Sequence, residues 1–269
     1  MALLQLNQAT IRFGGLTAVS ALDLQLGAGE LVGLIGPNGA GKTTAFNLIT
    51  GVYQPTSGDI IFDGKSIVGS PPYRITARRI ARTFQNIRLF PSLTVFDNVR
   101  AVFHLHLRGD VRHALWRGRG YHDEEQSIAS RALELLGLFH LEKFRDELAT
   151  SLPYGDQRRL EIVRALATQP KLLLLDEPAA GMNPTEKVEL ARLIRSLRDK
   201  FEIAILLVEH DMPLVMEICE RIAVLDYGIK IAEGLPAAIR ANPKVIAAYL
   251  GEESVAAARE SAADSMNSG

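Results

Sequence analysis

The sequence predicts an α/β fold with a parallel sheet at its centre. Three nearly continuous apolar runs, at 31–35, 172–175 and 203–208, are typical of strands buried on both faces. Helical patterns at 160–167 and 188–200 precede the second and third runs. Because strands that alternate with helices form parallel sheets, we expect these runs to lie in one central sheet.

The first third of the chain predicts a second, antiparallel sheet. Apolar and polar residues alternate at 3–13, 21–26 and 59–62, and turns that contain glycine bound these segments. Alternation with a period of two is typical of strands with one face in the core. An antiparallel β subdomain is therefore expected beside the central sheet.

A helical subdomain is expected between the two halves of the central sheet. Helical periodicity with charged faces occurs at 95–107 and 124–136, so we predict an insertion over about 86–159 within one domain spanning 1–251. Residues 252–269 contain almost no large apolar side chains with which to dock on the body. They are expected to form a disordered tail or a short exposed helix.

Composition excludes several classes of protein. The 269 residues are 47% hydrophobic, enough for a substantial core, and 30 basic against 31 acidic residues create no overall field that favours nucleic acid. The apolar runs are far shorter than the roughly 18 residues of a membrane span, and the N-terminus lacks the pattern of a secretion signal. The single cysteine, Cys219, is expected to be a buried apolar residue in a soluble chain.

A phosphate-binding loop directly follows the run 31–35. Residues 36–43 read Gly-Pro-Asn-Gly-Ala-Gly-Lys-Thr, which fits the pattern G-x-x-x-x-G-K-[ST], and a helical stretch comes next. Backbone N–H groups of such a loop surround phosphate oxygens, Lys42 supplies positive charge to the β- and γ-phosphates, and Thr43 offers a hydroxyl to Mg²⁺. The predicted nucleotide-binding residues here are Gly36, Asn38, Gly39, Ala40, Gly41, Lys42, Thr43 and Thr44.

Two adjacent carboxylates follow the run 172–175. Open α/β sheets bind ligands at the carboxyl ends of their strands, so Asp176 and Glu177 are expected beside the phosphate. We assign Asp176 to Mg²⁺, through water, and Glu177 to orienting or deprotonating the attacking water. The alternative for this pair is a capping role at a helix N-terminus.

Further motifs distinguish the chain from kinases and GTPases with a similar loop. Residues 152–159, Leu-Pro-Tyr-Gly-Asp-Gln-Arg-Arg, resemble the signature motif of the ATP-binding cassette (ABC) ATPases. Gln85 in Thr-Phe-Gln-Asn resembles the Q-loop of that family, residues 180–183 its D-loop and His210 its switch histidine. The resemblance covers about residues 3–250.

This resemblance implies a P-loop ABC ATPase fold and a head-to-tail dimer that binds ATP and Mg²⁺ between two cassettes. Gln85 would join Thr43 and Asp176 at the metal and sense the γ-phosphate. Phe13 stands where the family places an aromatic residue that stacks on adenine, although a core role is the alternative. The residues expected to contact ATP across the interface are Pro153, Tyr154, Gly155 and Asp156. The catalytic set is Lys42, Gln85, Glu177 and His210.

Four positions differ from the residues that are usual in the motifs of the family. Pro153, Tyr154 and Asp156 replace a serine, a glycine and a glutamine of the signature motif, and Asn183 replaces an aspartate of the D-loop. The lost serine hydroxyl removes one contact to the γ-phosphate. Binding across the interface is therefore expected to depend on the backbone N–H groups of Gly155 and its neighbours.

The amino-acid sequences of residues 80–90, 152–162 and 242–251 are similar to those of the branched-chain amino acid importer ATPases. Residues 104–122 resemble the insertion that distinguishes the longer of the two ATPases in those importers. The resemblance implies separate permease subunits, a second cassette ATPase, an extracytoplasmic substrate-binding protein and a peripheral location on the cytoplasmic side of the membrane. Urea or amide import and lipopolysaccharide export are the nearest alternatives. A soluble cassette that acts on nucleic acid is disfavoured, because such proteins usually carry two cassettes in one chain.

A basic stretch at 74–119 contains ten arginines and two acidic residues. The resulting patch is expected to be a solvated helical face, a contact to permease loops and anionic lipid, or, less favoured, a nucleic-acid surface. Trp116 among these arginines favours the membrane edge. Four histidines at 104–122 lack cysteine or acidic partners at regular spacing, so no metal site is expected there.

Overall fold

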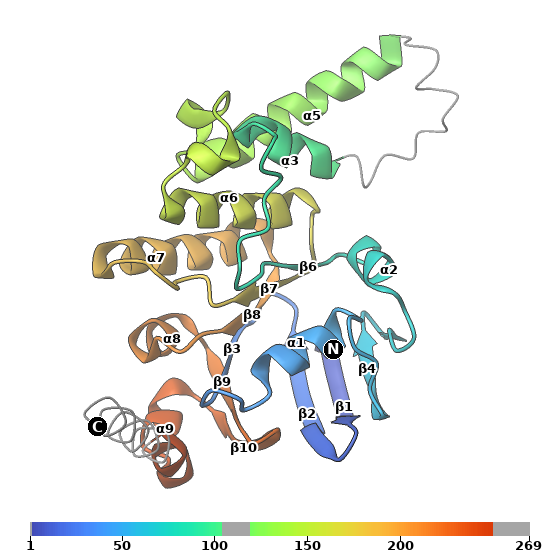
Figure 1. Ribbon diagram of the computed structural model, residues 1–269, viewed down its shortest axis with the longest axis vertical. Coiled ribbons are helices and arrows are strands. Elements are labelled where there is room, and N and C mark those ends of the chain that lie inside the picture. Colours follow the sequence, from blue (N-terminus) through green and yellow to red (C-terminus); the bar gives the residue numbers. More distant parts are fainter. Residues whose placement is uncertain (1, 104–118, 250–269) are drawn as a thin grey trace, which may run out of the picture.

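The structure is a computed structural model that describes residues 2–103 and 119–249. At the centre of this part lies a six-stranded sheet with the order β10-β9-β3-β8-β7-β6 (Figure 1). Neighbouring strands are parallel, except that β10 is antiparallel to β9. The strands are β3 (Leu31–Ile35), β6 (Ile80–Arg82), β7 (Leu172–Asp176), β8 (Ala204–Val208), β9 (Arg221–Asp226) and β10 (Ile229–Gly234).

The three apolar runs form neighbouring strands of this sheet. Every residue of β3, β7 and β8 is buried, because helices or the second sheet cover both faces. The predicted α/β class with a central parallel sheet is therefore confirmed. The carboxyl ends of β3 and β7 carry the phosphate loop and the acidic pair.

The predicted antiparallel sheet is also present, with the strand order β2-β1-β4-β5. Its strands are β1 (Ala2–Phe13), β2 (Leu16–Gly27), β4 (Ser57–Phe62) and β5 (Lys65–Ser66). Helix α1 (Lys42–Ile49) lies between this sheet and the central sheet, and Phe46 at its middle is fully buried (Figure 1). This packing fixes the phosphate loop, which immediately precedes α1, to both sheets.

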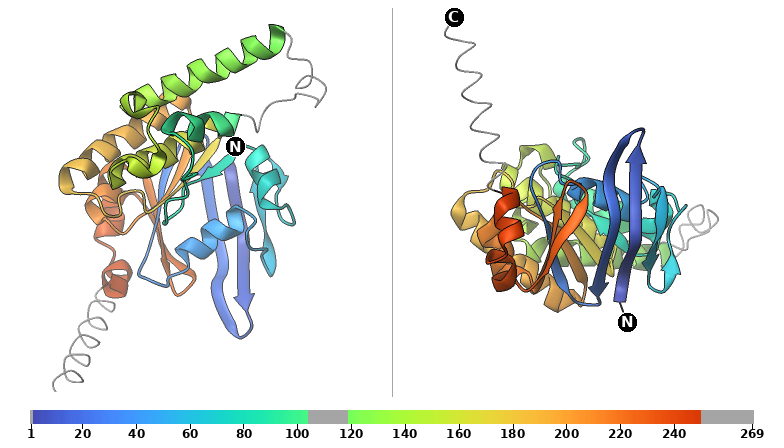
Figure 2. Two further views of the ribbon diagram at one scale, coloured as in Figure 1. Left: turned by 45° about the horizontal axis from the view of Figure 1, so that its top comes forward. Right: turned by 90° about the horizontal axis from the view of Figure 1, so that it is seen from below.

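Helices cover the other face of the central sheet. Figures 1 and 2 show α3 and α5 stacked beyond α6, on the side away from the sheet. Among the described residues, the labelled helices besides α1 are α2 (Pro72–Ala77), α3 (Val95–Phe103), α5 (Arg119–Leu138), α6 (Tyr154–Ala167), α7 (Pro184–Phe201), α8 (Met212–Ile218) and α9 (Pro236–Arg240), and residues 243–249 are also helical. Short 3-10 turns occur at η2 (Glu142–Phe144) and η3 (Ala149–Ser151). The expected helical subdomain is thus present as a layer of this fold.

Some expectations concern segments outside the described residues. The tail at 252–269, Trp116 and most of the insertion expected at 104–122 belong to them. None of the helices in the described part combines the length and the apolar character that a membrane span needs.

Cys219, at the end of α8, is a free thiol with 5% of its surface exposed, as the sequence predicted. Burial raises the pKa of this thiol from its ordinary value of 9.0 to about 12. We expect Ellman's reagent at a pH near 9 to modify Cys219 only after guanidinium unfolds the chain. Because only the unfolded thiol ionises between these two pKa values, stability should fall as the pH rises through that window. Equal labelling rates with and without denaturant would contradict a buried thiol.

Candidate nucleotide-hydrolysis site

The phosphate loop leaves β3 through a tightly enclosed turn. Gly36 has a φ of 151°, and a Cβ there would collide with the carbonyl oxygen of Leu225 on β9. Gly41 has a φ of 100°, and a Cβ there would lie 2.7 Å from the carbonyl oxygen of Ala18 on β2. Only glycine fits these two positions without a shift of the backbone. The loop is therefore shaped before any nucleotide arrives.

Lys42 points back into this loop. Its Nζ donates to the carbonyl oxygens of Gly36 at 2.6 Å and Pro37 at 2.8 Å, and the residue is 7% exposed. Asn38, Gly39 and Thr43 are exposed around it. The first turn of α1 contains no acidic residue, so the positive end of the helix dipole faces the loop without a competing carboxylate. The arrangement suits a polyphosphate.

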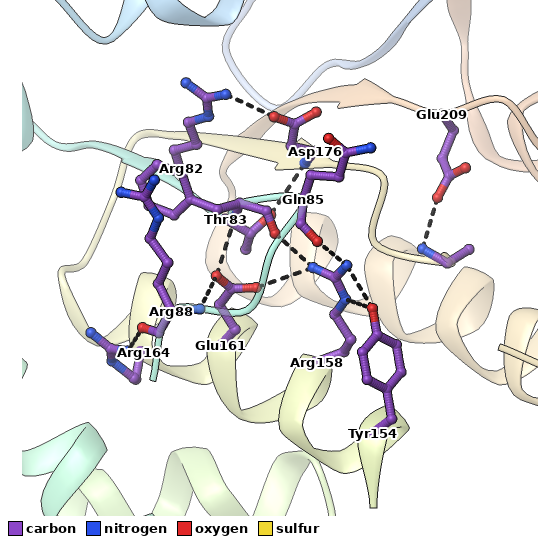
Figure 3. A network of polar contacts seen from close by, with 12 residues as sticks. Arg82, Thr83, Gln85, Arg88, Tyr154, Arg158, Glu161, Arg164, Asp176 and Glu209 are labelled. Atoms are coloured by element: carbon purple, nitrogen blue, oxygen red, sulfur yellow. Dashed lines mark hydrogen bonds and ion pairs between the residues drawn. The ribbon is translucent and has the colours of Figure 1, made fainter. Parts of the chain in front are cut away.

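Asp176 ends β7 and is 2% exposed. Its Oδ2 lies 2.7 Å from a terminal nitrogen of Arg82, and its backbone N–H donates to the Thr83 hydroxyl at 3.2 Å (Figure 3). The other terminal nitrogen of Arg82 donates to Asn47 Oδ1 on α1 at 2.6 Å. The guanidinium therefore links β6, α1 and β7 immediately beside the phosphate loop.

Arg82 corrects the expectation that the arginines of 74–119 form one basic patch. Its side chain is only 7% exposed and lies over the rings of Phe46 and Phe84, at 5.4 and 5.2 Å from their centroids. The reason is electrostatic, because the buried carboxylate of Asp176 requires a cation beside it. Among the described residues, Arg82 thus belongs to the site and not to an exposed surface.

Removing this cation should destabilise the fold. We expect Arg82→Met to lower the free energy of unfolding by about 3–5 kcal/mol, since Asp176 would be left as an uncompensated buried charge. Urea unfolding followed by circular dichroism measures this change. Arg100 is the control, because its pairs with Asp97 and Glu125 leave it 40% exposed, and Arg100→Met should cost less than about 1 kcal/mol. Equal losses for the two variants would contradict the special role of Arg82.

Glu177 follows Asp176 in a strained backbone conformation. Its φ is 47°, and its N–H donates to the carbonyl oxygen of Val208 at 2.8 Å. Gln85 Nε2 donates to Glu177 Oε2 at 3.0 Å, and His210 Nδ1 lies 3.9 Å from the same oxygen. Such a conformation in a residue other than glycine is typical of functional sites. The structure therefore brings together three of the four predicted catalytic side chains.

Glu209 is a residue of this region that the sequence analysis missed. It is fully buried, and burial raises the pKa of its carboxyl above the ordinary value of 4.5, against the opposing hydrogen bonds of backbone N–H groups. Its Oε1 accepts from the N–H of Ala179 at 2.7 Å and its Oε2 from that of His210 at 3.1 Å. Glu209 thereby links the segment after Glu177 to the histidine. The sequence did offer one signal for this role, because Glu209 directly precedes the predicted catalytic residue His210.

The signature segment lies at the start of α6, as expected. Pro153 is the N-cap residue of this helix, and Tyr154 follows it with 46% of its surface exposed. Asp156 pairs with Arg159 at 3.7 Å within the first turns. At Gly155, a Cβ would lie 3.4 Å from Glu186 Oε1 on α7.

The unusual Asn183 has a local structural explanation. It is the N-cap residue of α7, its Oδ1 accepts from the N–H of Glu186 at 3.0 Å, and Glu186 Oε2 accepts from the N–H of Asn183 at 2.9 Å. These reciprocal bonds form a capping box that satisfies two free N–H groups of the helix end. Asn183 therefore fixes the beginning of α7 after the D-loop segment.

Phe13 lies at the end of β1 and is 45% exposed, outside the core. It contacts Tyr53 edge to face, with the ring centroids 5.1 Å apart. The alternative that Phe13 is a core residue is thus wrong. Tyr53 was not recognised from the sequence, because it comes from a loop 40 residues further along the chain and only the fold pairs the two rings.

The fold and these groups define a P-loop nucleotide-binding protein: a phosphate loop lies between a buried strand and a helix, and a carboxylate pair ends β7, which β8 separates from the strand of the loop. The chain belongs to the ABC transporter family, whose profile matches residues 19–180. A second profile, described as branched-chain amino acid ATP-binding cassette transporter, matches residues 230–255. The chain is accordingly a nucleotide-binding ATPase.

Two relatives illustrate the range of the family. The high-affinity branched-chain amino acid transport ATP-binding protein BraF of Pseudomonas aeruginosa is 45% identical over 93% of this chain and 98% of its own length. The lipopolysaccharide export system ATP-binding protein LptB of Escherichia coli is 36% identical over 94% of this chain and 99% of its own. The sequence is thus more similar to the amino acid transport protein.

Solved structures confirm the predicted P-loop ABC ATPase fold. The ADP conformation of MJ1267, an ATP-binding cassette of an ABC transporter, superposes with a TM-score of 0.81 at 29% identity and covers 94% of this chain and 100% of its own. The dimeric post-hydrolysis state of the cassette MJ0796, bound to ADP and phosphate, gives a TM-score of 0.74 at 27% identity, with 87% and 98% covered.

Proposed function

We propose that this chain is the ATP-hydrolysing subunit of an importer of branched-chain amino acids. The observation that carries the proposal is the match of residues 230–255 to the profile of that class, together with 45% identity to BraF against 36% to LptB. The permeases would be separate subunits. This ATPase would then be a peripheral protein on the cytoplasmic side of the membrane, and an extracytoplasmic protein would deliver the amino acid.

ATP is proposed to bind between the phosphate loop of this chain and the signature segment of a second cassette. Residues 36–44 would surround the phosphates with N–H groups, and Phe13 would stack on adenine. The start of α6, at Pro153–Asp156, would direct its N–H groups at the γ-phosphate bound by the partner cassette. Nucleotide would therefore hold the two cassettes together until hydrolysis.

The oxygens around the loop fit a Mg²⁺ ion that accompanies the nucleotide. The Thr43 hydroxyl, the Asp176 carboxylate and the Gln85 amide offer the oxygen ligands that this ion prefers. Because Arg82 already occupies Oδ2 of Asp176 at 2.7 Å, we expect this carboxylate to act through its other oxygen or through water. The metal would supply positive charge to the β- and γ-phosphates.

Within this chain, Glu177 is proposed to orient and deprotonate the attacking water. Gln85 restrains the carboxylate of Glu177 through the 3.0 Å hydrogen bond to Oε2, and His210 Nδ1 lies 3.9 Å from the same oxygen. His210 is 62% exposed on its side chain, so a γ-phosphate can reach it. Lys42 would leave the carbonyls of Gly36 and Pro37 to neutralise the phosphates.

Purification of the assembly tests this function. The Glu177→Gln variant is trapped with ATP in native membranes, extracted in mild detergent and captured, and its partners are identified by mass spectrometry. Two different permeases with a second, shorter cassette ATPase are expected. Two copies of this chain with a lipid-export permease pair would instead assign it to lipopolysaccharide export, and recovery with ribosomes or nucleic acid would overturn a role in transport.

A further inference from the structure

A cluster of charged side chains on α6 contacts the main chain of the Q-loop segment. We call Arg158, Glu161 and Arg164 the α6 clamp. They follow one another at intervals of three residues, so neighbouring members share one side of the helix. Arg158 is 2% and Glu161 5% exposed, which is rare for charged side chains unless they have partners.

The partners are peptide groups of residues 84–88. One terminal nitrogen of Arg158 donates to the carbonyl oxygen of Phe84 at 2.6 Å, and the other donates to that of Gln85 (Figure 3). Glu161 Oε1 accepts from the N–H groups of Phe84 at 3.2 Å and Arg88 at 3.3 Å. Arg164 donates to the carbonyl oxygen of Arg88. The clamp thus binds carbonyls with cations and N–H groups with an anion.

These bonds fix the residue whose side chain reaches the catalytic carboxylate. Gln85 is exposed, and its Nε2 donates to Glu177 Oε2 at 3.0 Å. Restricting an exposed loop residue to a single conformation costs conformational entropy. Arg158 binds the carbonyl oxygens of the two peptide groups that flank Gln85. Glu161 holds the segment one peptide further out on one side, at the N–H of Phe84, and further along the chain, at the N–H of Arg88. Together these bonds remove most of this freedom.

Tyr154 fixes the clamp in turn. Its hydroxyl accepts from Arg158 Nε at 3.1 Å and from a terminal nitrogen of Arg158 at 2.9 Å. The ring lies against the D-loop segment, since a Cβ on Gly181 would come within 3.0 Å of it. Tyr154 is also one of the three positions of the signature segment at which the residue differs from the one usual in the family. A glycine in its place would leave Arg158 without this acceptor.

We infer that Arg158 is a positioning residue for ATP hydrolysis, which holds Gln85 against Glu177 through the peptide groups of the Q-loop, with its own guanidinium oriented by the Tyr154 hydroxyl. The inference rests on the proposed function, because it takes Glu177 as the group that activates water. Tyr154 of the signature segment would thus have a role within its own subunit, the orientation of Arg158.

Two substitutions of graded severity test the inference. Arg158→Gln removes the guanidinium and should lower kcat of the purified full chain about tenfold or more, with the affinity for a fluorescent ATP analogue changed less than about threefold. Tyr154→Phe removes only the hydroxyl and should lower kcat several-fold, less than Arg158→Gln, because the guanidinium keeps its bonds to the carbonyl oxygens of Phe84 and Gln85. Arg195→Gln on α7 is the control, because its exposed pair with Glu217 lies outside the clamp.

A double-mutant cycle separates positioning from general stabilisation. If Arg158 acts through Gln85, Arg158→Gln should lower kcat in the native chain but have little further effect in Gln85→Ala. Independent, multiplicative losses would overturn the inference, as would native kcat in both Arg158→Gln and Tyr154→Phe. Urea unfolding of each variant identifies a loss of fold, and Tyr154→Phe keeps the test valid if Arg158→Gln does not fold.

The same cycle distinguishes this inference from the proposed function. Native hydrolysis rates in Glu177→Gln and Gln85→Ala would refute the catalytic assignment itself. Low rates in these two variants, combined with independent effects of Arg158→Gln, would refute only the positioning role of the α6 clamp.

Discussion

Glu177→Gln is expected to lower kcat of ATP hydrolysis by about 10²–10⁴-fold, the usual contribution of a general base. Glutamine has the same shape and keeps the backbone at φ 47°, but its amide cannot accept the proton of the attacking water. The affinity for ATP should stay nearly the same, because the change affects only the transition state. Phosphate release and equilibrium titration with labelled ATP measure the two quantities separately.

The control is Glu189→Gln, which changes an exposed glutamate of α7 that pairs with Arg159. It should leave kcat unchanged. Hydrolysis by Glu177→Gln at the native rate would show that another group activates water, and a matching loss of ATP affinity would show that Glu177 supports binding.

Lys42→Ala is expected to weaken ATP binding about 100-fold or more. Lys42 is the cation that the loop encloses, and each charged hydrogen bond to a phosphate is worth about 1.5–3 kcal/mol. The variant also loses the bonds from Nζ to Gly36 and Pro37, so the loop itself should become less ordered. Titration with a fluorescent ATP analogue measures the affinity.

Lys171→Ala serves as the comparison, because this lysine is 41% exposed and pairs with Asp63 far along the chain. Its affinity for ATP should match that of the native chain. If Lys42→Ala bound ATP as tightly as Lys171→Ala, the assignment of the phosphate loop as the nucleotide site would be wrong.

The parts of this fold that the sequence predicted are those with local signals. The strands at 31–35, 172–175 and 203–208 are continuous apolar runs, and the phosphate loop depends on glycines whose φ angles only glycine tolerates readily. The acidic pair was identified because strand ends of parallel sheets meet at one edge. In each case the local sequence pattern was sufficient to predict the element or the site.

The parts that were missed depend on contacts between distant segments. Arg82 was counted among surface arginines, since its partner Asp176 is 94 residues away. Strand β6 has only three residues, and β10 contains no buried residue. Strand β9 was missed although its buried apolar run at 222–225 is as long as the run at 172–175. The α6 clamp combines an ordinary i, i+3 charge pair with peptide groups more than 70 residues earlier. No periodicity could reveal such a partner.

The most direct test of the central claim is the uptake of labelled leucine by cells whose only copy of this chain carries Glu177→Gln. If hydrolysis at this site powers branched-chain amino acid import, high-affinity leucine uptake should be lost, while uptake of an unrelated solute such as a sugar stays at the native rate. Leucine uptake at the native rate, with the variant protein present and inactive as an ATPase, would contradict the account.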